Sequence, residues 1–230
     1  MRLSFIVSFL LAGQFCLAQI DTTLIDNKIC IKTNPSAFID YYGGCSYRLG
    51  AEFKVIHNIA FSFEFGNYYD YGLDKLGLMI HPNGFIIRPE IKYYLNKYKL
   101  TTGKYVSLDV FYKKINFDHK DSISLPPTPI YEKQYTIWKD IYGINVKYGS
   151  LIVHKKKFVF EWYVGGGIRC IKGHNSLSSD EDKHVLAGDG HGGYADEGQR
   201  IIKGVWPNIM LGFKIGYSVK SKGFKLVRST

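Results

Sequence analysis

The residues best suited to chemistry gather in one polar stretch, residues 172–203. It holds three histidines, one serine of interest and six carboxylates: His174, Ser176, Asp180, Glu181, Asp182, His184, Asp189, His191, Asp196 and Glu197. A histidine beside a serine can activate the hydroxyl as a nucleophile, and an acid can orient the histidine. Carboxylates and imidazoles also bind metals, but the spacing here matches neither an EF-hand loop nor a zinc motif. We therefore expect no metal site or cofactor, and the simplest interpretation is a solvated surface loop.

A second set of candidate residues follows a strand-like alternation. From 209 to 219 the odd positions are apolar, whereas Gly212, Lys214, Gly216 and Ser218 occupy even positions. A period of two predicts a β-strand with one apolar and one polar face. The pattern recurs, and eight strands are predicted at residues 29–40, 47–56, 59–67, 85–95, 105–115, 137–148, 158–170 and 207–219.

The polar faces of these strands carry charges of both signs, which predicts a network inside a barrel. Opposite charges can pair across a narrow lumen, whereas charges of one sign would repel. We expect Lys214 to pair with a glutamate at 52, 64, 90 or 161. The same polar faces would also suit the solvent-exposed face of a soluble β-sandwich, which is the alternative fold. The predicted lumen network consists of Arg48, Glu52, Glu64, Arg88, Glu90, Lys92, Glu161, Arg169 and Lys214.

The N-terminal residues have the features of a secretory signal peptide. Arg2 supplies a positive charge, residues 5–11 are apolar, and Ala18 ends a small-residue cleavage site. We expect cleavage before Gln19, so that residues 1–18 form the signal, 19–219 an exported barrel and 220–230 a basic C-terminal tail. The alternative is a lipoprotein acylated at Cys16, which the large residues before that cysteine disfavour.

The lengths of the predicted elements favour a membrane barrel over a sandwich. No stretch after the signal approaches the roughly 20 apolar residues of a spanning helix, whereas tilted strands of about 9 to 11 residues cross a bilayer. Short connections at 57–58, 96–104 and 154–157 alternate with long ones at 68–84, 116–136 and 171–206. The sequence thus predicts an all-β protein, an eight-stranded antiparallel up-and-down transmembrane β-barrel. We expect the last strand to close it against the strand that begins at Ile29.

Together with the signal, three segments resemble a known family. Residues 31–35, 47–53 and 206–217 look like small outer-membrane β-barrel proteins of Gram-negative bacteria, the OmpA/OmpX-like family. The resemblance covers most of residues 28–219 and implies the fold and a location in the cell outer membrane, but it implies no activity. One departure is that the chain continues from Lys220 to Thr230 instead of ending at an aromatic residue.

A shorter element resembles an enzyme motif. The sequence His174-Asn175-Ser176 is similar to the His-x-Ser element of outer-membrane lipid A deacylases. The resemblance implies a lipid-modifying hydrolase as an alternative function. That element belongs on a strand face that reaches the lipid, whereas here it is predicted to lie in a loop.

The net charge restricts the partners of the protein. The net charge of +10 is spread over the predicted strands, turns and tail, so we expect no nucleic acid as a partner, but contacts with outer-membrane lipid and lipopolysaccharide.

Cys30, Cys45 and Cys170 remain after signal cleavage. A bridge between Cys45 and Cys170 stays open, but their strands are not neighbours, so free thiols are expected.

The favoured function is a structural or surface-interaction role rather than catalysis. An eight-stranded barrel is just wide enough for its own side chains, so we expect no large open pore. An external protein partner would meet the loops at 68–84, 116–136 and 171–206. The alternatives are the hydrolase, which would use His174 and Ser176, and a small passive channel.

Overall fold

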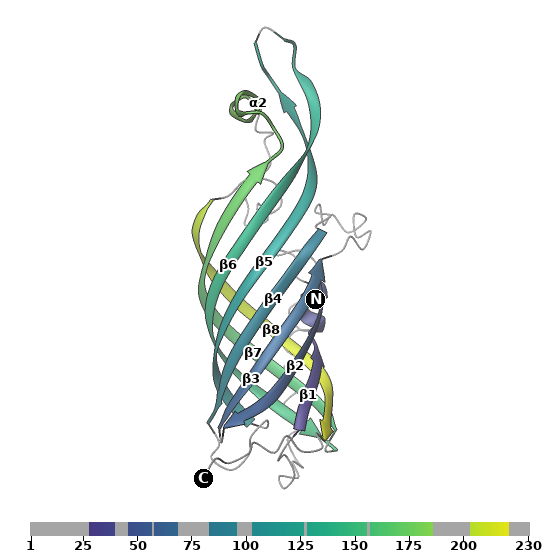
Figure 1. Cartoon of the computed structure of the whole chain (residues 1–230), viewed down its shortest axis with the longest axis vertical. Helices are drawn as coiled ribbons and strands as arrows, with labels where there is room; N and C mark the ends of the chain where they lie inside the picture. The colour runs from purple at the N-terminus through teal and green to yellow at the C-terminus, as the bar shows by residue number, and fades with distance from the viewer. Residues whose placement is uncertain are drawn as a thin grey trace, which may run out of the picture.

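The protein is a closed β-barrel whose strands follow one another around the ring. The computed structural model describes residues 28–39, 46–56, 58–68, 83–95, 103–126, 128–155, 157–185 and 203–220. Eight antiparallel strands pair in sequence order, which confirms the predicted up-and-down barrel (Figure 1). They are β1 (Lys28–Thr33), β2 (Ser46–Ile56), β3 (Ile59–Tyr68), β4 (Asn83–Tyr94), β5 (Gly103–Ile123), β6 (Tyr131–His154), β7 (Phe158–Asn175) and β8 (Gly204–Lys220).

The ring closes between its first and last strands, as the sequence predicts. Ile29 pairs with Val219, and Thr33 pairs with Ile215. Among the described residues, no helix is long and apolar enough to cross a membrane. The predicted signal at 1–18 lies outside the described residues, as does the predicted tail at 220–230 except for Lys220, which is the last residue of β8.

The first strand is shorter than predicted. The sequence predicts a strand from 29 to 40, but β1 ends at Thr33 and a 3-10 helix, η2 (Pro35–Ile39), follows. Pro35 fixes its own φ and has no N–H for the sheet, so it ends the strand. Ala37 donates its backbone N–H to the carbonyl oxygen of Asn34 at 3.1 Å. The helix η2 contacts β2 and β8, in the position where a longer β1 would have paired with both.

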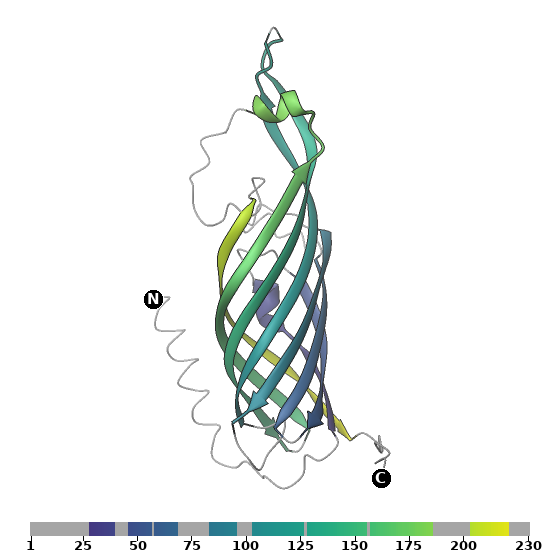
Figure 2. The ribbon, with the colours of Figure 1, turned by 60° about the vertical axis from the view of Figure 1, so that its left-hand side comes forward.

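Three strands are longer than predicted and project beyond the rest of the ring. The predicted loop at 116–136 is wrong, because β5 and β6 continue as a hairpin that pairs as far as Ile123 and Tyr131. The predicted loop at 171–206 is also wrong at its start, where β7 runs to Asn175 and a short helix, α2 (Ser179–Lys183), follows. The hairpin stands above the ring in Figures 1 and 2.

A small core holds the projection together. Phe117, Tyr135 and Ile137 are buried, and Leu177 packs against them. Glu181 of α2 accepts hydrogen bonds from Lys133 at 2.6 Å and from the Tyr131 hydroxyl at 3.0 Å. From the pair Asn116 and Trp138 to the pair Ile123 and Tyr131, seven residues rise about 23 Å at roughly 3.3 Å each.

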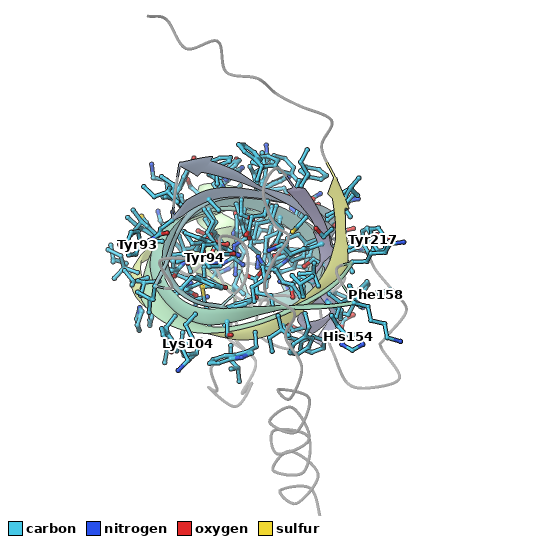
Figure 3. All side chains as sticks on the ribbon, turned by 90° about the horizontal axis from the view of Figure 1, so that it is seen from below. Tyr93, Tyr94, Lys104, His154, Phe158 and Tyr217 are labelled. Carbon is cyan, nitrogen blue, oxygen red and sulfur yellow. The ribbon has the colours of Figure 1, made fainter. Side chains whose placement is uncertain are left out.

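The barrel is inverted in polarity, with apolar side chains outside and charges inside. Burial alternates along the strands except at the upper end of β8, where residues 204–207 are all exposed, and the exposed positions hold large apolar residues on every strand. Side chains stand on both sides of the wall in the end-on view of Figure 3, in which Tyr93, Phe158 and Tyr217 point outward and Tyr94 points into the lumen. Examples of outward side chains, one from each strand in order, are Ile31, Leu49, Phe63, Ile91, Leu108, Val146, Val164 and Leu211.

Charged residues mark the upper limit of this apolar belt. Lys114 pairs with Asp140, and Asp140 pairs with Lys172, so the three form one row across β5, β6 and β7 on the outward face. Below this row, outward positions from Tyr142 to Ile152 on β6 are apolar except for Ser150. Ten residues of a strand tilted by about 40° rise roughly 25 Å, which equals the height of the apolar band of outer-membrane barrels.

Candidate functional site in the lumen

The lower lumen is filled by a ring of four charges from four strands. Lys32 on β1 contacts Glu52 on β2 at 2.5 Å and also Glu161 on β7. Lys92 on β4 contacts the same two carboxylates, at 2.7 Å to Glu52 and 2.6 Å to Glu161. All four side chains are at most 3% exposed. We call Lys32, Glu52, Lys92 and Glu161 the lower ring.

Two tyrosines complete the hydrogen bonding of the lower ring. The Tyr94 hydroxyl donates to Oε1 of Glu52 at 2.5 Å, and the Tyr105 hydroxyl donates to Oε1 of Glu161 at 2.6 Å. Gly149 leaves the space that Tyr105 occupies, because a Cβ there would lie 2.6 Å from its hydroxyl oxygen. Both carboxylates therefore have cationic and neutral donors, which an ion buried in a protein requires.

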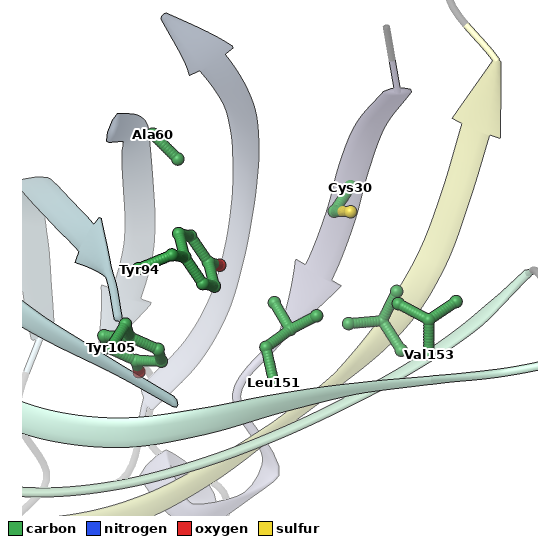
Figure 4. Close-up of a cluster of buried hydrophobic side chains, with 7 residues drawn as sticks. Cys30, Ala60, Tyr94, Tyr105, Leu151 and Val153 are labelled. Atoms are coloured by element: carbon green, nitrogen blue, oxygen red, sulfur yellow. The ribbon is translucent and has the colours of Figure 1, made fainter. Parts of the chain in front are cut away.

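An apolar layer lies beside the two tyrosines. Figure 4 shows Tyr94 and Tyr105 with Ala60 at one side of the lumen, and Leu151, Val153 and Cys30 at the other. Cys30 is buried and free, and Cys170 is also free. Cys45 lies outside the described residues, so its predicted state stays a prediction. This layer and the lower ring together fill the lower cross-section of the barrel.

A second network lies in the middle of the lumen. Lys214 contacts Glu64 at 2.9 Å and Glu90 at 3.7 Å, which are two of its four predicted partners. Lys147 contacts Glu90 at 2.8 Å and Asp109 at 3.6 Å. These five residues are nearly fully buried and come from β3, β4, β5, β6 and β8.

Arginines extend the middle network upward. Arg88 donates to both oxygens of Asp109, from Nη2 at 2.6 Å and from Nε at 3.3 Å. Asn145 donates to the same carboxylate at 2.9 Å. Arg48 lies 3.8 Å from Glu64 and donates to the Tyr68 hydroxyl at 3.3 Å. A bidentate arginine fixes the carboxylate in orientation as well as in charge.

All nine residues of the predicted network belong to the wall of the lumen, but the prediction is incomplete. Eight are buried, and Arg169, the ninth, lines a cavity above the middle network. Five further buried charges are not in the predicted network, although they stand at alternating positions of predicted strands: Lys32, Asp109, Lys113, Lys139 and Lys147. Counted over the described residues, the buried cations outnumber the buried carboxylates Glu52, Glu64, Glu90, Asp109 and Glu161; they are Lys32, Arg48, Arg88, Lys92, Lys113, Lys139, Lys147 and Lys214.

The cavity occupies the upper lumen and has a volume of about 350 Å³. Four cations line it: Arg48, Arg88, Lys113 and Arg169. No carboxylate is among its lining residues in the part of the chain that the structure describes. The wall here includes η2 and the upper half of β8, which pairs with β1 only from Ile215 onward.

The candidate catalytic residues lie outside the lumen. His174 is on β7 rather than in the predicted loop, and its exposed ring stacks on Trp138 with centroids 5.1 Å apart. His174 is the next outward position on β7 after Lys172, so it lies two residues above the charged row of Lys114, Asp140 and Lys172. Ser176 follows the strand, and its Oγ accepts the backbone N–H of Thr136 at 3.1 Å. Within the described residues, no hydrogen bond joins His174 to Ser176 or to a carboxylate.

Acidic residues of α2 make contacts within the helix and with the end of β7. Ser178 and Glu181 form a capping box, and Asp182 accepts a hydrogen bond from Asn175 at 2.6 Å. Among the described residues, no three histidine, cysteine, aspartate or glutamate side chains are grouped as a metal site. The carboxylates and histidine at 189, 191, 196 and 197 lie outside the described residues.

Comparison with known proteins gives a family. A family model described as "Protein of unknown function (DUF3575)" matches residues 5–187. The chain belongs to this DUF3575 family. The matched part of this DUF3575 protein runs from before β1 to beyond α2, so it includes seven of the eight strands. No curated protein matches the chain significantly.

One solved structure is similar to this DUF3575 protein. It is the N-terminal β-barrel domain of OprF from Pseudomonas aeruginosa, with 13% identity and a TM-score of 0.39. The alignment covers 84% of this chain and 98% of that chain.

Proposed function

We propose that the protein is an integral β-barrel of a Gram-negative outer membrane, with a structural or surface-interaction role. The observation that carries the proposal is the belt of exposed apolar side chains on all eight strands around a charged interior. Contiguous apolar surface of this extent is costly in water but matches a hydrocarbon layer. A soluble barrel or sandwich would need the opposite arrangement, so the belt argues against that alternative.

The lumen is proposed to be closed rather than conducting. The lower ring, Tyr94 and Tyr105 are at most 3% exposed and meet across the barrel. Moving an ion through this section would require breaking buried ion pairs, which is strongly unfavourable. We expect no steady conductance when the folded protein is added to a planar bilayer. Regular single-channel steps would support the alternative of a small passive channel.

The hairpin of β5 and β6 is proposed to face the outside of the cell. Short turns of outer-membrane barrels lie in the periplasm and long connections lie outside. Strand β6 ends and β7 begins at the end of the barrel that carries Lys28 and Lys220, whereas the hairpin and α2 stand at the opposite end. The hairpin rises above the charged row and has its own small core, so it presents a shaped surface to an external protein partner. Outer-membrane lipid and lipopolysaccharide are the partners proposed for the belt and its basic rims.

Cysteine labelling on intact cells tests location and orientation together. Thr128→Cys places a thiol at the tip of the hairpin, and Lys157→Cys places one at the opposite turn. We expect a membrane-impermeant maleimide to label the first variant on intact cells and the second only after lysis. The unsubstituted protein gives the background from its own cysteines. The reverse pattern would contradict the orientation, and recovery of the protein in the soluble fraction would contradict the membrane location.

No catalytic step is part of this proposal. The hydrolase alternative needs a serine hydroxyl activated by a histidine. His174 stacks on Trp138, and Ser176 bonds to the backbone of Thr136, so the present contacts hold the two side chains in different interactions.

A further inference from the structure

The upper lumen contains a cavity lined by four cations and by apolar side chains from β4, β5, β6 and β8. Arg48, Arg88 and Lys113 are each less than a tenth exposed, so their charges are held largely away from water. The rest of the wall includes Ile209 and Leu211 of β8. A cavity near 350 Å³ lies at the lower end of the range for small-ligand sites.

The cations are held in place by contacts with neighbouring side chains. Arg88 is held from below by Asp109 and lies over the Phe111 ring at 5.6 Å. Lys113 lies over the Tyr68 ring with Nζ 4.7 Å from the centroid, and Arg48 donates to the Tyr68 hydroxyl. Side chains positioned in this way need little reordering to bind an anion, which favours affinity.

The lining indicates a ligand that combines a phosphate with an apolar group. Several guanidinium and ammonium groups can share the oxygens of one phosphate, and arginine suits this geometry through its planar fork. On β8, the Asn208 amide can contact such a headgroup, whereas the neighbouring Ile209 and Leu211 would suit a hydrocarbon group. The ligand class is therefore an amphiphilic phosphate ester.

The wall provides a route for the apolar group. Ile209 and Leu211 point outward and are 87% and 80% exposed, yet both also line the cavity together with the inward Met210. Inward and outward side chains of β8 can line the same cavity only where the cavity extends past the edge of that strand. This edge lies where β8 has no pairing with β1, above Thr33 and Ile215.

The height of the cavity also fits a lipid headgroup. Lys113 pairs with Ile141, one position below the outward row of Lys114 and Asp140 that ends the apolar belt. The cavity is thus at the level of the outer leaflet close to its headgroups. We propose that the upper lumen binds the phosphate of an amphiphilic phosphate ester, whose hydrocarbon part leaves across the edge of β8. The choice of a membrane lipid as the source depends on the proposed outer-membrane location, whereas phosphate binding does not.

Binding measurements on the refolded full chain in micelles test the proposal. The probes are dioctanoyl phosphatidic acid, glycerol 3-phosphate and inorganic phosphate, with dioctanoyl phosphatidylcholine as the zwitterionic comparison. We expect saturable binding of phosphatidic acid by native mass spectrometry, and weaker binding of phosphatidylcholine. If the two soluble phosphates bind as tightly, the phosphate site is supported and its source is soluble rather than a lipid.

Neighbouring lysines on opposite faces of β5 supply a matched control. Lys113→Gln removes a cavity cation, whereas Lys114→Gln removes one charge from the outward face at the same height. Loss of a charged hydrogen bond should weaken binding of phosphatidic acid about tenfold or more in the first variant and leave it nearly unchanged in the second. If Lys113→Gln does not fold, Arg169→Gln and the outward Lys172→Gln form an equivalent pair on β7. Equal effects within a pair, or no saturable binding of any phosphate, would overturn the proposal.

Discussion

Lys92 on β4 and Glu161 on β7 meet inside the barrel with Nζ and Oε1 2.6 Å apart, although their strands are not neighbours in the ring. Neither side chain is exposed. Lys32 and Glu52 join them, so that the lower ring has two positive and two negative charges. The contact connects distant parts of the wall through the lumen rather than through the sheet.

We expect each single substitution at Lys92 or Glu161 to lower the free energy of unfolding mainly by leaving the partner charge unpaired. Glu161→Gln or Lys92→Met alone leaves an unbalanced buried charge and should lower the free energy of unfolding by about 3–5 kcal/mol. The double variant leaves the pair of Lys32 and Glu52 balanced, so its loss should be about 1–3 kcal/mol smaller than the sum of the single losses. Urea unfolding in micelles measures all three, with the exposed Lys104→Met as control. Additive losses would contradict a coupled ring.

The outward belt gives a prediction that depends on the bilayer. Val146 is 57% exposed in the middle of the belt on β6, and Ile130 is 64% exposed near the tip of the hairpin. Val146→Arg should lower the free energy of unfolding from a bilayer by about 2–4 kcal/mol, because it places a charge near the midplane. Ile130→Arg should change the free energy of unfolding by less than about 0.5 kcal/mol, as is usual for substitutions at a solvent-exposed surface. Unfolding from lipid vesicles measures both, and equal effects would contradict a belt that faces lipid.

Alternation explains both the success and the failures of sequence-based prediction. Lys214 was correctly expected to contact glutamates, because a period of two places it on the face of Glu64 and Glu90. The hairpin beyond Asn116 was missed because few apolar residues, such as Phe117 and Ile123, continue the alternation there, so the contrast between faces is weaker than in the belt. The cavity could not be predicted from the sequence either, because its lining depends on the tilt and register of strands far apart in the chain.

The hydrolase alternative makes a direct prediction about His174 and Ser176. No hydrogen bond joins the two side chains in the described part of the chain, and each has a contact of its own, with Trp138 and Thr136 respectively. We expect membranes that contain the protein to deacylate lipid A no faster than membranes that contain Ser176→Ala or His174→Ala. Mass spectrometry of extracted lipid A measures this. An activity of the unsubstituted protein that both variants lose would establish catalysis and refute the purely structural role.

The attachment of α2 to the hairpin should depend on pH through Glu181. Hydrogen bonds from Lys133, and from the backbone and side chain of Ser178, lower the pKa of Glu181 from its usual value of 4.5 to about 2. A lowered pKa means that the folded form favours the ionised carboxylate, so its contribution to stability is complete above about pH 4.5 and is lost as the pH falls toward 2.

The expected observation is a local transition that leaves the barrel intact. The amide resonances of Ser178 and Glu181 should shift in NMR spectra of the protein in micelles with a midpoint near pH 2, because these amides belong to the capping box. Amides of the lower strands should not follow the same curve. Glu181→Gln keeps the shape of the side chain but cannot ionise, so its spectra should show no such transition. A midpoint at pH 4.5 in the unsubstituted protein would mean that the contacts of Lys133 and Ser178 with Glu181 do not persist in solution.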